Sequence, residues 1–456
     1  FPEMEIRQCG DMQEPMELLE LPGISLDYFL RGLAGEAYQD NAVFQELYSW
    51  YLQSPEYRIL VKKLTEASFS ERPSDKIGKT VAKILYGEIS PYSATRLERF
   101  AACAFAHFLQ YGLRAQEREP AEFDSRFYGT FVHDVLEHVV QQPEREGGFA
   151  AVPRSRVQEL AQGLDWAELT EEERNRIIDS CLDQVSADYG NTILKSSARN
   201  EYMIERTRRI LRRTVWALQE QLKHGAFRPE GFEVRFQGGR IDRVDIMEEP
   251  ENNRVYVKVI DYKTGNTSFD LLALYHGLQL QLMVYLDGAL QVEKRKYPDR
   301  EIIPAGVFYY NVKDPMIQEK IHADMESINE QMLKKMKMNG LVEADDNMST
   351  KIDSTMASIP VSLNRDGSFS KRSSVASRKQ FDALGAYVRR KICDIRESIL
   401  DGNAAVEPYE LGKKNACTYC PYLTVCGFDR KIPGYEFHRL SSIEEDALWK
   451  KIMKGE

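Results

Sequence analysis

The sequence has no apolar stretch long enough to cross a membrane as a helix. Its longest run without Asp, Glu, Lys or Arg extends from Leu271 to Leu286 and still contains His276, Gln279 and Gln281, whereas a membrane helix needs about 20 predominantly apolar residues. The N-terminus lacks the basic and apolar regions of a secretory signal, and its first residue is not Met. We therefore expect a non-secreted chain that is a piece of a longer protein.

Cysteine is scarce, and positive charge is in the minority. Seven cysteines are too few for a disulfide framework in 456 residues, and the number is odd. Three of them lie within ten residues near the C-terminus, which indicates metal ligation in a reducing compartment and predicts a cytoplasmic location. The 61 Lys and Arg against 71 Asp and Glu give a net charge of −10, which disfavours a non-specific nucleic-acid binder but allows a local basic groove.

A phosphate-binding loop is also missing. The Gly78-Lys79-Thr80 sequence would need a second Gly five positions before Gly78, and Pro73 stands there. We therefore expect no nucleotide site at this place.

The pattern of apolar residues predicts helices at both ends and strands in the middle of the chain. Helical periodicity covers residues 1–90 and 150–225, and shorter helices are expected at Leu97–Leu109, Phe131–Val140, Leu271–Leu290 and Lys379–Leu400. Alternating apolar residues predict strands at Phe232–Phe236, Arg240–Met247, Arg254–Lys263 and Ile303–Asn311.

The clearest candidate site is a pair of acids on two of these predicted strands. If the second and third strands form an antiparallel hairpin, Asp242 faces Asp261, with Val244 opposite Val259 behind them and Lys263 on the same side. Facing carboxylates repel each other across a sheet, and a divalent cation that binds both removes this conflict. Lys263 would then hold the attacking water or the negative charge that develops on phosphorus. The pattern favours metal-dependent hydrolysis of a phosphodiester.

The alternative is that the two acids are exposed strand-end residues in ion pairs with Arg240, Arg243 or Lys263. We prefer the catalytic interpretation because both acids lie in register at the end of an apolar stripe.

Two helical pairs flank this hairpin in the sequence. His133 and Glu137 are four residues apart on one helical face, and a neutral imidazole there is a candidate metal ligand. Gln281 and Tyr285 have the same spacing on an otherwise apolar helix and are candidates to position a phosphate or a base. The alternative for each pair is a purely structural role.

A basic stripe precedes the strands. Arg206, Arg209 and Arg213 lie on one face of a helix predicted from Tyr202 to Leu222. Such a run is often only a solvated surface, but in an acidic protein it is also a candidate surface for DNA phosphates.

The cysteine run near the C-terminus is one ligand short of a four-cysteine site. Cys417, Cys420 and Cys426 give the spacing C-x₂-C-x₅-C, and the candidates for the fourth ligand are Cys9, Cys103, Cys181 and Cys393. We select Cys103 because it precedes the candidate catalytic residues on an apolar helix, so that the site would staple the two ends of the region together. The residue types do not distinguish an iron–sulfur cluster from zinc.

Together these motifs resemble the RecB-like branch of the PD-(D/E)XK nucleases, and within it the nuclease region of the AddB subunits of bacterial AddAB helicase–nucleases. The segments that carry the resemblance span most of residues 91–430: Ser93–Cys103, Gly129–His133, Gly239–Asp245, Val259–Gly265, Gly277–Tyr285, Ile359–Leu363, Asp366–Arg372 and Cys417–Cys426.

The resemblance implies an α/β fold with a restriction-endonuclease-like PD-(D/E)XK core, in which helices flank a mixed central sheet. This core would occupy residues 91–430, with a helical insertion at about 145–225. Residues 1–90 would be the end of a helicase-like region or a linker, and residues 431–456 a C-terminal tail.

The resemblance also implies the roles of individual residues. Mg²⁺ or Mn²⁺ would be bound by His133, Asp242 and Asp261, with Lys263, Gln281 and Tyr285 completing the catalytic set, and a [4Fe–4S] cluster would be held by Cys103, Cys417, Cys420 and Cys426. The implied activity is exonuclease processing of DNA ends, on the 5′-ended strand, in double-strand-break repair and recombination. The implied partners are a single-stranded DNA end and an AddA-type subunit that forms a heterodimer with this one.

Two other functions are compatible with these motifs. One is a stand-alone iron–sulfur exonuclease of the same superfamily, like the exonuclease of CRISPR adaptation, although the long segments at 1–90 and 342–400 argue against it. The other is a non-catalytic DNA-binding scaffold, which would bind DNA but no metal at the paired acids.

Overall fold

The computed structural model describes residues 22–33, 42–68, 76–87, 93–116, 125–141, 167–188, 197–317, 324–345, 347–432 and 434–455. The described residues up to Ser68 form one compact unit, and those from Lys76 form a second. Cys9 and much of the expected insertion at 145–225 lie outside the described residues.

The first unit consists of three short helices: α1 (Pro22–Leu33), α2 (Ala42–Gln53) and α3 (Arg58–Ser68). They enclose a small core of Phe29, Phe44, Tyr51 and Val61. The helical character predicted for this part of the chain is confirmed for its described residues.

The second unit is built on a mixed six-stranded sheet: β1 (Arg228–Phe236), β2 (Gly239–Glu249), β3 (Arg254–Lys263), β4 (Glu301–Asn311), β5 (Asn339–Glu343) and β6 (Val375–Ala376). The strands follow in chain order across the sheet. The pairs β3–β4 and β5–β6 are parallel, whereas the other three neighbouring pairs are antiparallel. The four strands predicted from the sequence are confirmed, and β5 and β6 extend the sheet beyond β4.

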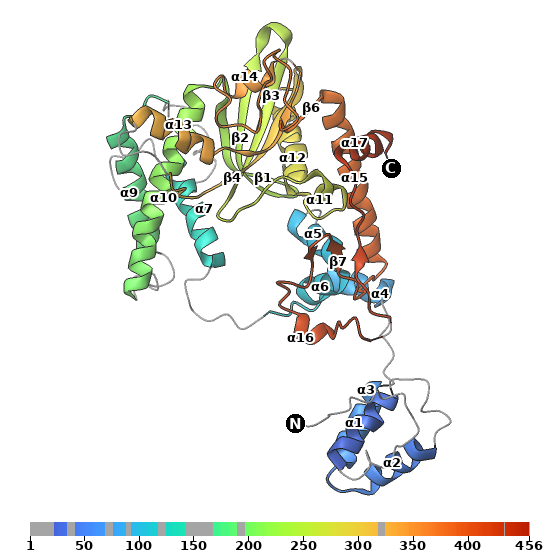
Figure 1. The fold of residues 1–456 in the computed structure, drawn as a ribbon. Helices are drawn as coiled ribbons and strands as arrows, with labels where there is room; N and C mark the ends of the chain where they lie inside the picture. Colours follow the sequence, from blue (N-terminus) through green and yellow to red (C-terminus); the bar gives the residue numbers. More distant parts are fainter. Residues whose placement is uncertain are drawn as a thin grey trace. The chain divides into compact units, whose positions relative to one another are not determined.

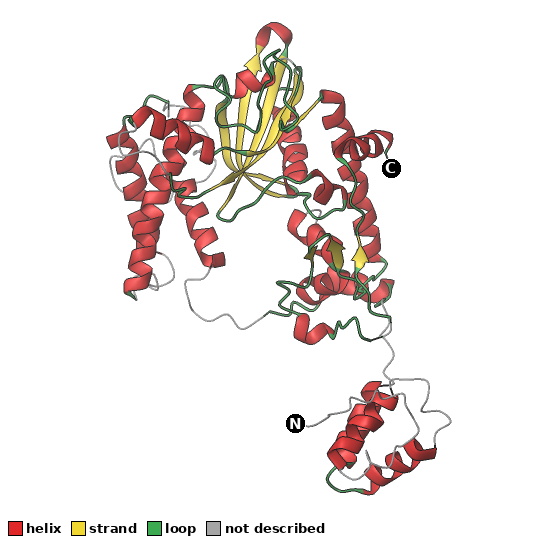
Figure 2. Ribbon diagram, in the orientation of Figure 1, coloured by secondary structure: helices red, strands yellow, loops and turns green. Residues whose placement is uncertain are grey.

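Helices cover both faces of this sheet, so the unit has three layers (Figures 1 and 2). One core lies between the sheet and the helices α7 (Ser125–Gln141), α9 (Glu171–Asp188), α10 (Ala198–Lys223), α13 (Met325–Lys335) and α14 (Met348–Ile352). The other core lies on the opposite face, under the helices α4 (Lys79–Tyr86), α5 (Ala94–Ala102), α11 (Leu271–Tyr275), α12 (Gln281–Lys296), α15 (Arg378–Leu400) and α17 (Glu445–Lys454). The expected mixed sheet between helical layers is therefore confirmed.

Two helices that the sequence predicts as continuous are interrupted. The helix expected at Leu271–Leu290 is divided into α11 and α12 by a turn at Gly277, whose φ of 81° is in the left-handed region that favours glycine. The helix expected at Leu97–Leu109 is broken at Cys103, whose extended backbone separates α5 from α6 (Ala104–His107) and a π-helical turn at Phe108–Gly112.

A smaller lobe brings together segments that lie near the two ends of the second unit. It contains α6, α16 (Leu423–Cys426) and a sheet of β7 (Tyr409–Leu411), β8 (Lys414–Asn415) and β9 (His438–Arg439), which lie near one another in Figure 1. The hydroxyl of Tyr422 donates to the carbonyl of Ala115 at 2.9 Å across this lobe. In the described part of the chain, no helix combines the length and apolar composition that a bilayer crossing requires.

Candidate functional site

The ladder between β2 and β3 has the register that the sequence predicted. Val244 pairs with Val259, and this pairing brings Asp242 beside Asp261 on the neighbouring strand. The main-chain N–H of Tyr262 donates to Asp242 Oδ2 at 2.7 Å and holds that carboxylate against β3. Both acids are buried, with 9% of Asp242 and 1% of Asp261 exposed.

A line of hydrogen bonds leads from Asp261 to helix α12. Lys263 Nζ lies 2.6 Å from Asp261 Oδ2 and donates to Gln281 Oε1 at 2.9 Å. Gln281 Nε2 in turn donates to the hydroxyl of Tyr285 at 2.9 Å. The line forms because Lys263 follows Asp261 by two positions on β3, and Tyr285 follows Gln281 by one turn of α12. These contacts fix the orientation of the ammonium group and of the amide.

Helix α7 brings a histidine to the same place from the other layer. His133 Nδ1 lies 3.6 Å from Asp242 Oδ2, and its ring meets that of Tyr262 edge to face, with 6.4 Å between the centroids. Burial lowers the pKa of His133, which keeps the imidazole neutral at neutral pH and able to bind a metal ion. The side chain of Glu137, its expected companion, lies outside the described residues.

The two central acids are difficult to ionise together. Burial raises the pKa of Asp242 to about 6, although the N–H of Tyr262 and the charge of Lys263 act in the opposite direction. Burial, and next the charge of Asp242, raises the pKa of Asp261 to about 6. A divalent cation between the two carboxylates would remove this repulsion.

Exposed ion pairs do not explain the two acids. The nearby arginines have other partners, because Arg243 donates to Asp245 at 2.6 and 2.9 Å on the opposite face of β2, and Arg240 pairs with Glu233. Of the three basic residues that this interpretation invoked, only Lys263 contacts one of the two buried acids.

Glu233 on β1 belongs to the site, although the sequence analysis did not select it. One ligand atom from each of His133, Glu233 and Asp242 lies within 4.8 Å of the others, close enough for one metal ion. The backbone φ of Glu233 is 50°, a strained conformation for a side chain of this kind. Val234 pairs with Ile241, so the β1–β2 pairing sets Glu233 next to Asp242. Counting residues back from the Gly238 turn would have found it.

Glu98 on α5 is a second residue that the sequence analysis missed. Its Oε1 accepts the main-chain N–H groups of Leu280 and Gln281 at 2.6 and 2.9 Å, at the start of α12. Burial raises the pKa of Glu98 to about 7, while these two hydrogen bonds lower it. No local pattern signals such a contact, since 183 positions separate Glu98 from Gln281 in the chain.

The four cysteines expected to share a site meet in the small lobe. Cys103 lies where α5 ends and belongs to an apolar cluster with Ala106, Leu109 and Tyr422. Burial raises the pKa of the Cys103 thiol, and its neighbouring thiols raise it further. The neighbours come from the other end of the region: Cys417, Cys420 and Cys426.

Two of the four cysteine sulfur atoms have hydrogen-bond donors directed at them. The guanidinium of Arg99 reaches Cys420 Sγ at 4.0 Å, and the main-chain N–H of Phe428 donates to Cys426 Sγ at 3.5 Å. Four thiols, apolar surroundings and N–H groups directed at sulfur fit an iron–sulfur cluster.

The arginine stripe on α10 carries ion pairs. Arg209 Nε lies 2.7 Å and Arg213 Nη1 lies 2.9 Å from the carboxylate of Asp314, whereas Arg206 is exposed to solvent. The stripe comes from a different element than the central acids, and the structure records no contact between the two among the described residues.

Comparison with known proteins supports one family. A family model described as the PD-(D/E)XK nuclease superfamily matches residues 91–427. A subunit of the ATP-dependent helicase/deoxyribonuclease of Lachnoclostridium phytofermentans is 36% identical, in an alignment that covers 100% of this chain and 39% of the relative. The subunit of the same name from Thermoanaerobacter pseudethanolicus is 33% identical, in an alignment that covers 91% of this chain and 36% of the relative. That from Alkaliphilus metalliredigens is 32% identical, over 98% of this chain and 39% of the relative.

The chain thus spans about two fifths of the length of these curated relatives. The family match, in contrast, extends over most of this chain and includes every element that carries the paired acids, the lysine and the glutamine. Nucleases of this superfamily hydrolyse phosphodiester bonds with divalent metal ions, a chemistry that the group of His133, Glu233 and Asp242 fits. The chain therefore belongs to the PD-(D/E)XK nuclease superfamily, and residues 91–427 form a nuclease domain, a phosphodiester hydrolase.

Proposed function

We propose that this domain is a Mg²⁺-dependent DNA exonuclease that processes DNA ends in double-strand-break repair and recombination, acting on the 5′-ended strand. The observation that carries the proposal is the hydrogen-bonded line Asp261–Lys263–Gln281–Tyr285 beside the second buried acid, Asp242. It combines a cation-binding pair with a fixed ammonium group, and both can stabilise the negative charge that develops when a phosphodiester is hydrolysed.

His133, Asp242 and Asp261 would hold the metal ion. Of these, His133 and Asp242 belong to the group whose ligand atoms lie within 4.8 Å of one another; its third member is Glu233, a further carboxylate, and not Asp261. When bound, Mg²⁺ polarises a phosphoryl oxygen and lowers the pKa of a bound water. The protein prepares this site in advance, because the N–H of Tyr262 orients the Asp242 carboxylate.

Lys263 would donate from its ammonium group to the attacking water or to a phosphoryl oxygen as negative charge develops there. Asp261 and Gln281 contact its Nζ from two sides and hold it in place. Tyr285 has a supporting role, since its hydroxyl accepts from Gln281 and leaves the amide oxygen facing Lys263.

We also propose that Cys103, Cys417, Cys420 and Cys426 hold a [4Fe–4S] cluster. The N–H group of Phe428 and the guanidinium of Arg99 near two of the sulfurs support it. Protein purified without oxygen should absorb visible light and contain about four iron and four sulfide ions per chain. A colourless protein with stoichiometric zinc would contradict this assignment.

We propose that incoming DNA follows the stripe of Arg206, Arg209 and Arg213. The Asp314 carboxylate pairs with two of these arginines and offsets one of their two charges. A DNA phosphate would compete with it for the same guanidinium groups. Replacing Arg209 and Arg213 together by Ala should weaken binding of single-stranded DNA and reduce its dependence on salt.

We propose that the complete protein works as a subunit of a cytoplasmic helicase–nuclease. The names of the relatives describe subunits of an ATP-dependent helicase/deoxyribonuclease, and an AddA-type motor subunit would deliver the single-stranded end as the heterodimer's second chain. In this assignment residues 1–90 are the end of a helicase-like region or a linker, residues 91–430 are the nuclease and residues 431–456 are a C-terminal tail. Helix α4 of the first segment and helix α17 of the last both pack in the core of the nuclease unit.

The proposed activity is tested with labelled single-stranded DNA and Mg²⁺, using the chain alone and the complex with its partner. Asp261→Ala and Lys263→Ala should each lower the cleavage rate by at least about 100-fold, whereas Asp366→Asn, at an exposed acid, should leave it unchanged. Equal cleavage by wild type and Asp261→Ala would overturn the assignment of the site.

A further inference from the structure

Helix α12 starts at the position that the catalytic line requires, and a residue of another helix determines this start. The first N–H groups of a helix have no partner within it and need acceptors from elsewhere. At α12, Oε1 of Glu98 accepts from Leu280 and Gln281 at 2.6 and 2.9 Å. The contact is needed because the turn at Gly277 interrupts the helix before it reaches Gln281.

Gln281 is therefore held by two hydrogen bonds, one from its main chain and one to its side chain. Its N–H donates to Glu98, and its Oε1 accepts from Lys263 Nζ at 2.9 Å. The charges of Glu98 and Lys263 also attract each other. A shift of Glu98 would move the start of α12 and, with it, the amide that orients the lysine.

Helix α5 is held firmly enough to act as the support. Leu97, next to Glu98, is buried in the core beneath the sheet. On the other side, Arg99 reaches Cys420 Sγ and lies over the ring of Tyr422 at 5.7 Å from its centroid. Glu98 thus extends from a helix anchored both in the nuclease core and in the cysteine lobe.

We propose that Glu98 is a positioning residue for the nuclease reaction: its carboxylate fixes the start of α12 and thereby holds Gln281 against Lys263. This inference rests on the proposed function of Lys263 and Gln281. Glu98 touches neither the metal ligands nor the substrate in this role, and it acts only through the helix.

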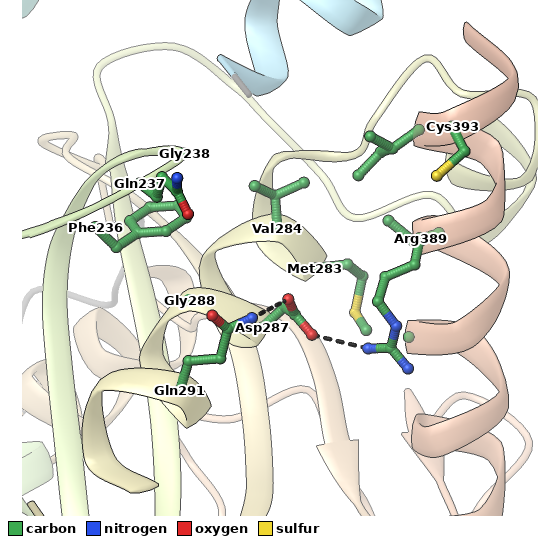
Figure 3. A pocket seen from close by; sticks show the side chains of 13 residues that line it. Phe236, Gln237, Gly238, Met283, Val284, Asp287, Gly288, Gln291, Arg389 and Cys393 are labelled. Atoms are coloured by element: carbon green, nitrogen blue, oxygen red, sulfur yellow. Dashed lines mark hydrogen bonds and ion pairs between the residues drawn. The ribbon is translucent and has the colours of Figure 1, made fainter. Parts of the chain in front are cut away.

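The chain offers a matched control on the same helix. Asp287 of α12 pairs with Arg389 of α15 at 2.8 Å, and Figure 3 shows this ion pair at a pocket between the two helices. It also ties α12 to a neighbouring helix, but two turns after the start of α12. Losing it should affect the packing of α12 without disturbing Gln281.

The experiment compares cleavage of single-stranded DNA by Glu98→Ala, Glu98→Gln and Asp287→Ala with that of the wild type, in the same chain or complex. Glu98→Ala should lower kcat by about tenfold or more and change KM by less than about twofold. Glu98→Gln keeps an oxygen that can accept both N–H groups, so it should retain most of the rate. Asp287→Ala should cleave at the wild-type rate.

A double-mutant cycle separates positioning from general destabilisation. In a Gln281→Ala background, Glu98→Ala should cause little further loss, because the amide that it positions is already gone. Multiplicative losses in the double variant would overturn the proposal, and so would a wild-type rate in Glu98→Ala.

Amide hydrogen exchange makes the test independent of activity. Exchange in the segment that contains Leu280 and Gln281 should be faster in Glu98→Ala and near the wild-type rate in Glu98→Gln and Asp287→Ala. An unchanged rate in Glu98→Ala would overturn the positioning role. A wild-type protein without nuclease activity would instead refute the proposed function, while exchange would still report whether Glu98 fixes this helix start.

Discussion

Asp242 and Asp261 are buried side by side, and their charges make the metal-free site unfavourable. Only 9% and 1% of these residues are exposed, and burial raises the pKa of each carboxyl group to about 6. Such an arrangement costs stability and indicates a functional requirement, since apolar side chains at these positions would pack without repulsion.

This conflict predicts that removing one charge stabilises the metal-free protein. Asp242→Asn keeps an oxygen for the N–H of Tyr262 and removes the repulsion with Asp261. At pH 7.5 in the presence of a chelator, the free energy of unfolding should rise by about 1 to 3 kcal/mol, measured by denaturant unfolding, while DNA cleavage is lost. A lower stability than wild type would show that the charge is already compensated without metal.

The same pKa values predict how metal binding depends on pH. The folded pKa of each acid is above its ordinary value of 3.8, so the folded protein binds protons at these two acids more tightly than the unfolded chain does. Proton binding therefore stabilises the fold at low pH, and this stabilisation is lost as the pH rises through about 6. Mg²⁺ needs the ionised forms and competes with protons. The Mg²⁺-induced rise in melting temperature should therefore be large at pH 8 and small at pH 5. A rise of equal size at both values would contradict the prediction, and Asp242→Asn should show little rise at either.

The positions of single residues could be predicted from the sequence where the period of a strand or helix determines them. The two-residue period of a strand was enough to set Asp242 beside Asp261, and the same counting across the next turn leads to Glu233. Glu98 could not be found in this way, because its partners follow it by more than 180 positions. Only the packing of α5 against α12 brings them together.

At the scale of elements, the interruption between α11 and α12 is the feature that departs most from the sequence pattern. The sequence pattern predicted one helix at Leu271–Leu290, but the left-handed Gly277 ends the first segment and Glu98 caps the second. The local pattern carries no signal for the capping residue, which belongs to another helix.

This turn predicts the effect of a single methyl group. Gly277→Ala places a side chain at a φ of 81°, with its Cβ 3.3 Å from the Cβ of Ala101, and should lower stability by about 1 to 2 kcal/mol. Gly265→Ala is the control, because its Cβ meets nothing within 4 Å. Thermal unfolding of both variants decides the matter, and equal melting temperatures would contradict the role given to this turn.

The sheet shows the same limit of local patterns. β1 to β4 are long and alternate clearly, and the sequence predicted them. β5 has five residues and β6 only two. Such short segments show no clear alternation, and their formation depends on the completed fold.

At the scale of the whole molecule, the fold brings together cysteines from the two ends of the nuclease region that are more than 300 positions apart in the chain. A shared cluster would restrict the unfolded chain and hold α5 near the catalytic helix. The sequence suggested three candidate ligands by their spacing, whereas Cys103 was selected from four candidates. In the structure Cys103 lies beside the other three.

This closure predicts that one ligand change loosens both ends. Cys426→Ser should remove the visible absorption and make the chain sensitive to a protease near Cys103 and near the C-terminus, because the cluster no longer joins them. Cys393→Ser is the control, since this cysteine is exposed on α15. If proteolysis of the two variants is alike, the cysteine site does not act as a staple.

The most direct measurement is calorimetric titration of the metal-free protein with Mn²⁺, which substitutes for Mg²⁺. The wild type and Asp366→Asn should bind Mn²⁺, and Asp242→Asn and Asp261→Asn should bind it at least about tenfold more weakly. Equal affinity of all four proteins would contradict the claim that these two acids share a catalytic metal ion.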